Sequence, residues 1–239
     1  MDILAIDTTG RAVTAALARD DSILGEVFIN STQNHSITLM PMIKQLLDSV
    51  SMSASELTHI ACASGPGSFT GLRIGAATAK ALAYTLNIPI VAVPTLDALA
   101  YNIFDAQSII APVMDARRQQ VYTALYTRNA KNDNLTRLTD YQALDIIDLL
   151  SKLSELNKPV IFLGDGMPVY KDIILKNSFS IKYVFAPLPS ILQRASSVAS
   201  LAIKMAAEGK TTDCESFIPF YLRPSQAERQ REHELRGLL

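Results

Sequence analysis

Residues 60–86 read IACASGPGSFTGLRIGAATAKALAYTL. The apolar residues 60–63 predict a strand, the glycine-rich residues 64–71 a loop, and residues 71–86 a helix. Glycines in such a loop let the backbone turn its N–H groups toward an anion at the start of the helix. No Gly-Lys-Ser or Gly-Lys-Thr follows, so this is not a Walker A loop. Two interpretations stay open: a phosphate-binding loop, or a tight turn that packs the helix on a sheet.

The predicted helix at 71–86 has almost no polar side. Small and apolar residues point in every direction around it, and Lys80 is its only charged residue after the first turn. Because a helix with a solvated side normally shows a polar arc, this one is either buried in its own domain or covered by another chain. The second interpretation is favoured in a chain of this length. Ala79 and Ala83, spaced i, i+4 with Ala76 beside them, would form a smooth strip for a second helix.

The rest of the chain repeats one plan twice: three strands in hairpins, then helix, strand and helix. In the first half, strands are predicted at 3–6, 12–18, 22–28, 60–63 and 90–93, and helices at 36–50, 71–86 and after Pro94. In the second half, strands are predicted at 109–114, 120–126, 135–138, 160–163 and 182–185, and helices at 141–156, after 166 and at 196–208. This predicts an α/β protein of two duplicated lobes, 1–104 and 105–239, each with a mixed sheet flanked by helices. Helix 196–208 is able to pack back on the first lobe, and residues 224–239 read as a solvated, mobile tail.

Composition excludes several classes of protein. The 239 residues are 49% hydrophobic and 19% charged, which predicts a folded chain. A net charge of −1 lacks the bulk positive field of a protein that binds nucleic acid by itself. No apolar run is long enough for a membrane span, and no basic segment opens the chain as in a signal peptide. Cys62 and Cys214 have no CxxC spacing, which excludes zinc fingers and a disulfide framework and favours the reducing cytoplasm.

Several motifs together resemble one known family. They are Ile6-Asp7-Thr8-Thr9, the glycine run and helix from Ser64 to Ala83, Thr95-Leu96-Asp97-Ala98-Leu99-Ala100, Met114 to Tyr122, and Pro219-Phe220-Tyr221-Leu222-Arg223. In this order they resemble the bacterial TsaB (YeaZ) family, the dimerisation subunit of the machinery that makes threonylcarbamoyladenosine in tRNA. The resemblance implies an actin-like ATPase (ASKHA) fold, which agrees with the duplicated plan.

The resemblance also bears on nucleotide binding. In actin-like ATPases an aspartate at the end of the first strand orients metal-bound water, and Asp7 occupies that place. The residues implied near a nucleotide or phosphate are Asp7, Thr8, Thr9, Gly67, Ser68, Gly164 and Gly166. Asp165 stands where the adenosine-side turn would have a second consecutive glycine, and its carboxylate would repel phosphate and crowd a purine. We therefore expect no autonomous ATP hydrolysis.

A metal site is not expected in this chain. The catalytic relative, TsaD, holds a metal with two histidines spaced i, i+4, which places both rings on one helical face. The matching positions here are Thr95 and Leu99, and a leucine cannot bind a metal. The three histidines, His35, His59 and His233, form no such pair.

Two other polar segments have a structural interpretation beside a functional one. Ser64, Ser68 and Thr70 would suit a peptidase only with a positioned base, which no histidine motif supplies, so helix capping and turn formation are favoured. Arg117 and Arg118 lie in a turn that is either solvated or in contact with a partner or an acidic ligand. Both interpretations stay open.

The resemblance implies a function in which this chain supplies no catalytic group. It would bind a TsaD-like subunit that transfers threonylcarbamoyl to the adenosine 3′ of the anticodon, in tRNAs reading codons that begin with A. A TsaE-like ATPase would recycle the complex, and the isolated chain would form a homodimer. The chain would need no cofactor of its own, with ATP and a metal ion in the partner subunits and tRNA bound through the complex.

The expected partner surface lies on the two helices of the first lobe. Its residues are His35, Leu39, Met42, Leu46, Gly71, Arg73, Gly75, Ala76, Ala79, Lys80 and Ala83. The alternative function, from a different class, is an autonomous actin-like ATPase or a phosphotransferase acting on a small substrate.

Overall fold

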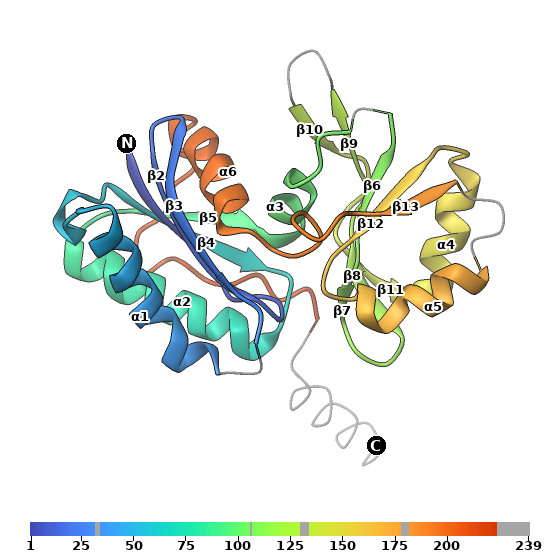
Figure 1. Ribbon diagram of the computed structural model, residues 1–239, viewed down its shortest axis with the longest axis horizontal. Helices are drawn as coiled ribbons and strands as arrows, with labels where there is room; N and C mark the ends of the chain where they lie inside the picture. The colour runs from blue at the N-terminus through green and yellow to red at the C-terminus, as the bar shows by residue number, and fades with distance from the viewer. Residues whose placement is uncertain (32–33, 106, 130–133, 178–181, 224–239) are drawn as a thin grey trace, which may run out of the picture.

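The computed structural model shows two lobes side by side, with the N-terminal lobe on the left in Figure 1. It describes residues 1–31, 34–105, 107–129, 134–177 and 182–223. The predicted tail at 224–239 lies outside these residues. In the described part of the chain, no helix is both long enough and apolar enough to span a bilayer.

The first lobe is built on a five-stranded sheet. Its strands are β1 (Asp2–Asp7), β2 (Val13–Arg19), β3 (Ser22–Ile29), β4 (His59–Gly65) and β5 (Ile90–Pro94). They lie in the order β3-β2-β1-β4-β5, in which β1, β2 and β3 form antiparallel hairpins and β1, β4 and β5 run parallel. The short polar connections in the sequence correspond to the hairpin turns, and central β1 is buried on both faces.

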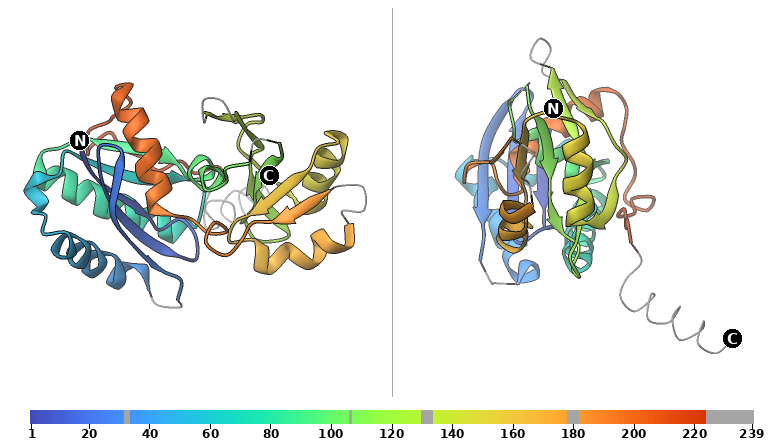
Figure 2. Two further views of the ribbon diagram at one scale, coloured as in Figure 1. Left: turned by 45° about the horizontal axis from the view of Figure 1, so that its top comes forward. Right: turned by 90° about the vertical axis from the view of Figure 1, so that its right-hand side faces the viewer.

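Helices cover both faces of this sheet (Figures 1 and 2). On one face lie α1 (His35–Ser49) and α2 (Phe69–Leu86), and the 3-10 turn η1 (Ala54–Glu56) lies between them in the chain. The helix α6 (Ala195–Ala207) covers the other face. The short helix α3 (Thr95–Tyr101) lies between the lobes. Because side chains alternate along a strand, Leu4 and Ile6 pack toward α1 and α2, whereas Ile3 and Ala5 pack toward α6. The helix α6 therefore packs on the first sheet, although it follows the second lobe in sequence.

The second lobe repeats the same strand order. Its main sheet contains β6 (Ile109–Pro112), β9 (Tyr126–Asn129), β10 (Asn134–Arg137), β12 (Val160–Leu163) and β13 (Tyr183–Phe185), in the order β10-β9-β6-β12-β13. A smaller sheet contains β7 (Met114–Asp115), β8 (Gln120–Thr123) and β11 (Gln142–Asp145), and the helices are α4 (Ile146–Glu155) and α5 (Met167–Asn177). Numbered within each lobe, both main sheets have the order 3-2-1-4-5. The expected α/β fold of two duplicated lobes, each with a mixed sheet flanked by helices, is confirmed.

The predicted helix at 141–156 is wrong at its start. Residues Gln142–Asp145 instead form β11, which pairs antiparallel with β8. Asp145 then caps α4, because its carboxylate accepts a hydrogen bond from the N–H of Ile147 at 2.8 Å. This aspartate is the signal that marks the true beginning of the helix.

The predicted strands at 109–114 and 120–126 are each divided in two. The chain passes from the main sheet, where β6 pairs with β9, to the small sheet, where β7 pairs with β8. Near this crossing the N–H of Leu125 donates to the hydroxyl of Thr139 at 3.0 Å, a side-chain bond outside the strand ladders. The one predicted hairpin therefore contributes to two sheets.

The predicted alanine strip of α2 faces its own sheet. Ala76, Ala79 and Ala83 are buried in one cluster with side chains of β1, β4 and α1, and Ala79 has no exposed surface. The expectation that this strip lies open to a partner is therefore wrong. The other predicted partner residues buried in the lobe are Leu39, Met42, Leu46, Gly71 and Gly75.

A second pair of alanines on α2, two positions before the predicted pair, faces the solvent. Ala77 and Ala81 are exposed, again spaced i, i+4, and exposed Tyr84 continues the same face. Because small residues occur on every side of this helix, the sequence does not distinguish the buried strip from the exposed one. The remaining predicted partner residues reach the surface: Arg73 is exposed, and His35 and Lys80 are half-buried.

The turn after β1 lies directly against the start of α2. The hydroxyl of Thr8 donates to the carbonyl oxygen of Gly71 at 2.7 Å. A Cβ on Gly71 would overlap the backbone carbonyl of Thr8, and a Cβ on Gly75 would lie 2.6 Å from the Thr8 hydroxyl oxygen. Glycine is required at both positions because the helix and the turn approach so closely.

Gly71→Ala is expected to lower the free energy of unfolding by about 2–3 kcal/mol, because the new methyl group meets backbone that cannot move aside. Gly25→Ala is the matched control, since its methyl group would lie 2.9 Å from the end of the flexible Leu46 side chain. Urea unfolding of both variants measures the difference. Equal stability of the two variants would contradict the close approach of helix and turn.

Candidate functional site

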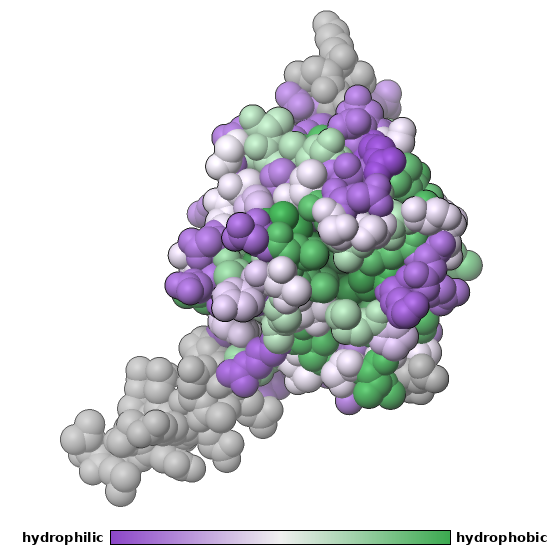
Figure 3. Space-filling view, turned by 90° about the vertical axis from the view of Figure 1, so that its left-hand side faces the viewer, coloured by the Kyte–Doolittle hydropathy of each residue, from purple (hydrophilic) through white to green (hydrophobic). Residues whose placement is uncertain are grey.

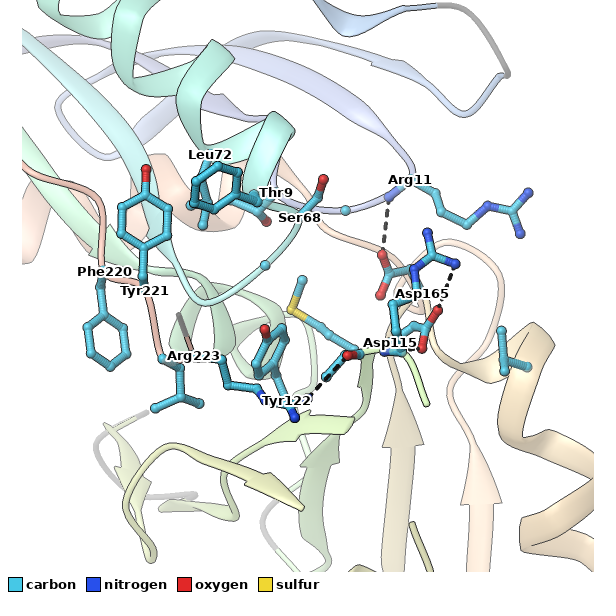
Figure 4. A pocket seen from close by; sticks show the side chains of 18 residues that line it. Thr9, Arg11, Ser68, Leu72, Asp115, Tyr122, Asp165, Phe220, Tyr221 and Arg223 are labelled. Carbon is cyan, nitrogen blue, oxygen red and sulfur yellow. Dashed lines mark hydrogen bonds and ion pairs between the residues drawn. The ribbon is translucent and has the colours of Figure 1, made fainter. Parts of the chain in front are cut away.

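A cleft of about 530 Å³ lies between the two lobes. Its walls come from the β1–β2 turn, the start of α2, the β7–β8 turn and residues 220–223 near the end of the described chain (Figure 4). Three of the residues predicted near a nucleotide line it: Thr9, Gly67 and Ser68. The other four, Asp7, Thr8, Gly164 and Gly166, are not among its lining residues.

Asp7 ends β1 with a buried carboxylate. One oxygen accepts hydrogen bonds from the N–H and the hydroxyl of Thr9, at 2.8 and 2.7 Å. The other oxygen is buried and has no hydrogen-bond partner among the described residues. Burial raises the pKa of Asp7 to about 6, although the bonds from Thr9 act in the opposite direction. In this structure Asp7 therefore holds its own turn in place.

The glycine loop packs against that turn. The N–H of Ser68 donates to the carbonyl of Thr9 at 2.7 Å, and the hydroxyl of Ser68 accepts from the N–H of Gly71 at 3.3 Å. A Cβ on Gly67 would lie 2.6 Å from the same Thr9 carbonyl oxygen. Two N–H groups that a phosphate could use at the helix start are therefore bonded within the protein. This geometry favours the tight-turn interpretation of the loop.

Asp165 reaches from the second lobe to the first. One of its oxygens accepts a hydrogen bond from the N–H of Arg11 at 3.1 Å (Figure 4), and the other is buried with no partner among the described residues. Burial raises the pKa of Asp165 to about 6, although the hydrogen bond from the N–H of Arg11 acts in the opposite direction; the nearby carboxylates of Asp115 and Asp7 add to the rise. The carboxylate thus bridges the lobes on the wall of the cleft.

The glycines beside Asp165 are needed to fold their turn. Gly164 has a φ of 116°, a value that side chains rarely allow, and a Cβ there would overlap the carbonyl of Val113. The N–H of Gly166 donates to that carbonyl at 3.0 Å. Both glycines therefore have a packing role against the chain that follows β6.

The turn after β7 carries two arginines in an unusual backbone conformation. Arg117, Arg118 and Gln119 have φ values of 66°, 54° and 61°, a left-handed run that is rare outside glycine. Asp115 stabilises the turn, because its carboxylate accepts from the N–H of Arg117 at 2.8 Å and pairs with the Arg117 guanidinium at 3.3 Å. Tyr170 of α5 donates to the same carboxylate at 2.9 Å. Both arginines are exposed, and Arg117 lines the cleft whereas Arg118 is not among its lining residues.

The sequence did not predict that the last described segment belongs to the cleft. The N–H of Phe220 donates to the carbonyl of Ser64 at 2.7 Å, and the guanidinium of Arg223 donates to the carbonyl of Ala116 at 3.4 Å. Residues 220–223 therefore connect the two lobes and line the cleft. The sequence feature that could have indicated a site here is the aromatic pair Phe220-Tyr221 followed closely by Arg223.

The positions that match a histidine pair belong to the protein interior. The hydroxyl of Thr95 accepts a hydrogen bond from the N–H of Gly65 at 3.0 Å, and Leu99 is buried in the cluster that joins α3 to the second lobe. Across the described ranges, no three side chains of His, Cys, Asp or Glu are grouped to hold a metal ion. Of the three histidines, His35 lies 3.2 Å from the carbonyl oxygen of Arg11, His59 lies beside Thr58, and His233 lies outside the described residues.

Comparison with known proteins gives one consistent relationship. Residues 22–231 match the family model described as TsaD, tRNA N6-adenosine threonylcarbamoyltransferase. The chain is 38% identical to the tRNA threonylcarbamoyladenosine biosynthesis protein TsaB of Bacillus subtilis, over 95% of this chain and 96% of that protein. It is 28% identical to the protein of the same name from Escherichia coli, over 95% and 96% of the two chains. Among solved structures, YeaZ from Pseudomonas aeruginosa is similar with a TM-score of 0.75 and 25% identity, covering 92% of this chain and 99% of that one.

Asp7→Asn is expected to raise the free energy of unfolding by about 1–3 kcal/mol at pH 7–8. The folded-state pKa of Asp7 lies above its ordinary value of 3.8, so the folded protein binds this proton more tightly than the unfolded chain does. The wild type therefore loses stability relative to the variant as the pH rises from about 4 to about 6, and the difference stays constant above that range.

Urea unfolding between pH 4 and pH 8 measures this difference. Asp21→Asn, at an exposed aspartate in the β2–β3 turn, is the control and should change the unfolding free energy by less than about 0.5 kcal/mol. A difference between wild type and Asp7→Asn that does not vary with pH would refute the raised pKa.

Proposed function

Since this chain belongs to the TsaB (YeaZ) family, we propose that it is a non-catalytic subunit of the machinery that makes threonylcarbamoyladenosine in tRNA. Two of its relatives are named as biosynthesis proteins of this modified nucleoside. The chain binds a TsaD-like catalytic subunit and supports transfer of threonylcarbamoyl to the adenosine 3′ of the anticodon, in tRNAs reading codons that begin with A. A TsaE-like ATPase recycles the complex.

The interior of the molecule supports a role without catalysis. Thr95 and Leu99 occupy the places of a metal-binding histidine pair, and both are committed to packing between α3 and its surroundings. Asp165 adds a carboxylate to the wall of the cleft, and the N–H of Ser68 is bonded to Thr9. These features favour a chain that needs no cofactor, with ATP and a metal ion held by the partner subunits.

The observation that carries this proposal is the exposed outer face of α1 and α2. Ile37 and Met40 of α1 are 69% and 47% exposed, and Tyr84 of α2 is 75% exposed. Seen from the side of the first lobe, hydrophobic groups reach the surface among charged ones (Figure 3). Large apolar side chains exposed on two neighbouring helices are typical of a protein–protein interface.

The shape of this face suits helices as partners. Ala77 and Ala81 leave a shallow strip along α2, where the backbone of a second helix can approach closely. Paired helices of the catalytic subunit would pack against α1 and α2 to form a bundle. A second copy of this chain would use the same face to form a homodimer when the catalytic subunit is missing.

Ala77→Arg is expected to weaken binding to the catalytic subunit by at least about 100-fold while the protein stays folded. A charge left unpaired in a closed interface costs about 3–5 kcal/mol, and about 3 kcal/mol corresponds to that loss of affinity. Ala207→Arg is the matched control, because Ala207 is exposed at the end of α6 on the opposite side of the sheet.

Circular dichroism, titration calorimetry with the catalytic subunit and analysis of modified tRNA test the two variants together. A folded Ala77→Arg protein that binds the subunit as well as Ala207→Arg does would exclude this face.

Calorimetry with ATP and magnesium separates the proposal from an autonomous ATPase or phosphotransferase. Because the N–H of Ser68 at the start of α2 is already bonded and Asp165 stands at the turn that would hold the adenosine side, the usual mononucleotide position is disfavoured, and we expect the isolated chain to bind ATP with a dissociation constant weaker than about 100 μM. Asp165→Asn provides the comparison, since it removes the charge and keeps the shape. A dissociation constant near 1 μM for the wild type, about −8 kcal/mol, with turnover of ATP would favour the enzyme instead.

A further inference from the structure

The cleft between the lobes is lined by aromatic and arginine side chains to which the proposed function gives no role. Four of the described residues that line it are aromatic: Phe69, Tyr122, Phe220 and Tyr221. Arginines from both lobes line the same cleft. Rings and cations in one groove are typical of sites for single-stranded nucleic acid, because bases stack on the rings while phosphates pair with the cations.

The rings form a series that joins the lobes. Phe69 of α2 lies 5.1 Å from Tyr221, measured between ring centroids, and the guanidinium of Arg73 lies 4.1 Å from the Phe69 centroid. On the other lobe, Phe220 lies 5.8 Å from Tyr141. Phe220 and Tyr221 are nevertheless 41% and 37% exposed, so both keep ring surface that a base can cover.

The charge available in the cleft is positive, although the chain as a whole has a net charge of −1. Arg11, Arg117 and Arg223 line it. Of the two lining carboxylates, Asp115 is paired with Arg117, and Asp165 is buried and accepts the N–H of Arg11. The Arg11 side chain extends away from Asp165 (Figure 4) and makes no ion pair in the described part of the chain.

We propose that this cleft binds a short stretch of single-stranded RNA, with bases on the exposed rings and phosphates on Arg11 and Arg223. This rests on the proposed function, which it deepens by giving this subunit a direct contact with unpaired nucleotides of the RNA substrate. Unpaired RNA is the form that proteins recognise by stacking, because its bases are free of the helix.

The arrangement fits several nucleotides better than one. A single base has two faces, whereas four rings line the cleft and are divided between α2, β8 and the segment 220–223. The arginines likewise come from three separate segments instead of converging on one phosphate. The N–H of Ser68, at the start of α2, is already bonded to Thr9, so the usual place for a mononucleotide phosphate is occupied.

Fluorescence anisotropy with the purified full chain tests the proposal. The probe is a fluorescein-labelled, unstructured 12-nucleotide RNA of adenosine and cytidine, titrated at 50 mM and higher salt. We expect binding that weakens with salt. Arg11→Gln combined with Arg223→Gln should weaken it about tenfold or more and reduce the slope of log affinity against log salt by about 1.4, or 0.7 for each lost phosphate contact.

Two further variants complete the design. Tyr221→Leu keeps apolar packing but removes the stacking face, and it should also weaken binding about tenfold. Arg19→Gln is the matched control, because Arg19 ends β2 at the end of the strands remote from the cleft and its ion pair with Asp2 is exposed. It should bind RNA as the wild type does. Thermal unfolding of each variant confirms that it is folded.

Three results would overturn the proposal: no binding by the wild type at 50 mM salt, equal weakening by Arg19→Gln, or displacement of the RNA by micromolar ATP, which would mark a mononucleotide site. Association of the same variants with the catalytic subunit is measured in parallel. It should be unchanged, because Arg11, Arg223 and Tyr221 lie on the cleft and not on the outer face of α1 and α2. Failure of RNA binding is thereby distinguished from failure of the proposed function.

Discussion

The turn at Thr8 and Thr9 lies so close to α2 that no side chain fits between them at Gly71 or Gly75. The Thr8 hydroxyl is bonded to the carbonyl of Gly71, and the Thr9 carbonyl accepts the N–H of Ser68. Because Gly71 and Gly75 lie against this turn, the side of α2 that carries them faces the sheet and the opposite side faces water. The turn also shapes the first-lobe wall of the cleft, since the glycine loop follows the turn. Both the outer surface and the cleft depend on this close approach of the turn to the helix.

Much of the fold could be predicted from the sequence, because it depends on repeated local patterns. Short polar connections between apolar runs fixed the hairpins, and their recurrence indicated two lobes of one design. Where a tertiary contact decided the outcome, prediction failed. Residues 142–144 have no local feature that distinguishes a strand from the first turn of a helix, and only their pairing with β8 makes them a strand. Asp145 does mark the start of the helix, but as a single capping residue it was outweighed by the apolar pattern.

The candidate site could be predicted only in part. Asp7 and the glycine loop were recognisable by resemblance, but their hydrogen bonds to neighbouring backbone could not be read from residue types. The orientation of α2 was undetermined for a physical reason: with alanines at 76, 77, 79, 81 and 83, every direction around the helix is almost equally apolar. Phe220 and Tyr221 were missed as cleft residues because they lie more than 130 positions from α2 and reach it only in the folded chain.

Residues 220–223 also restrict the movement of the two lobes away from each other. Many two-domain proteins, kinases among them, work by a hinge that opens and closes the domains around a ligand. Here one segment is bonded to Ser64 of the first lobe and to Ala116 of the second, and Asp165 adds a third tie across the gap. Separating the lobes would break the bond of Asp165 and at least one of the two bonds of this segment. The last described segment therefore opposes separation of the lobes, so that the orientation of one lobe constrains that of the other.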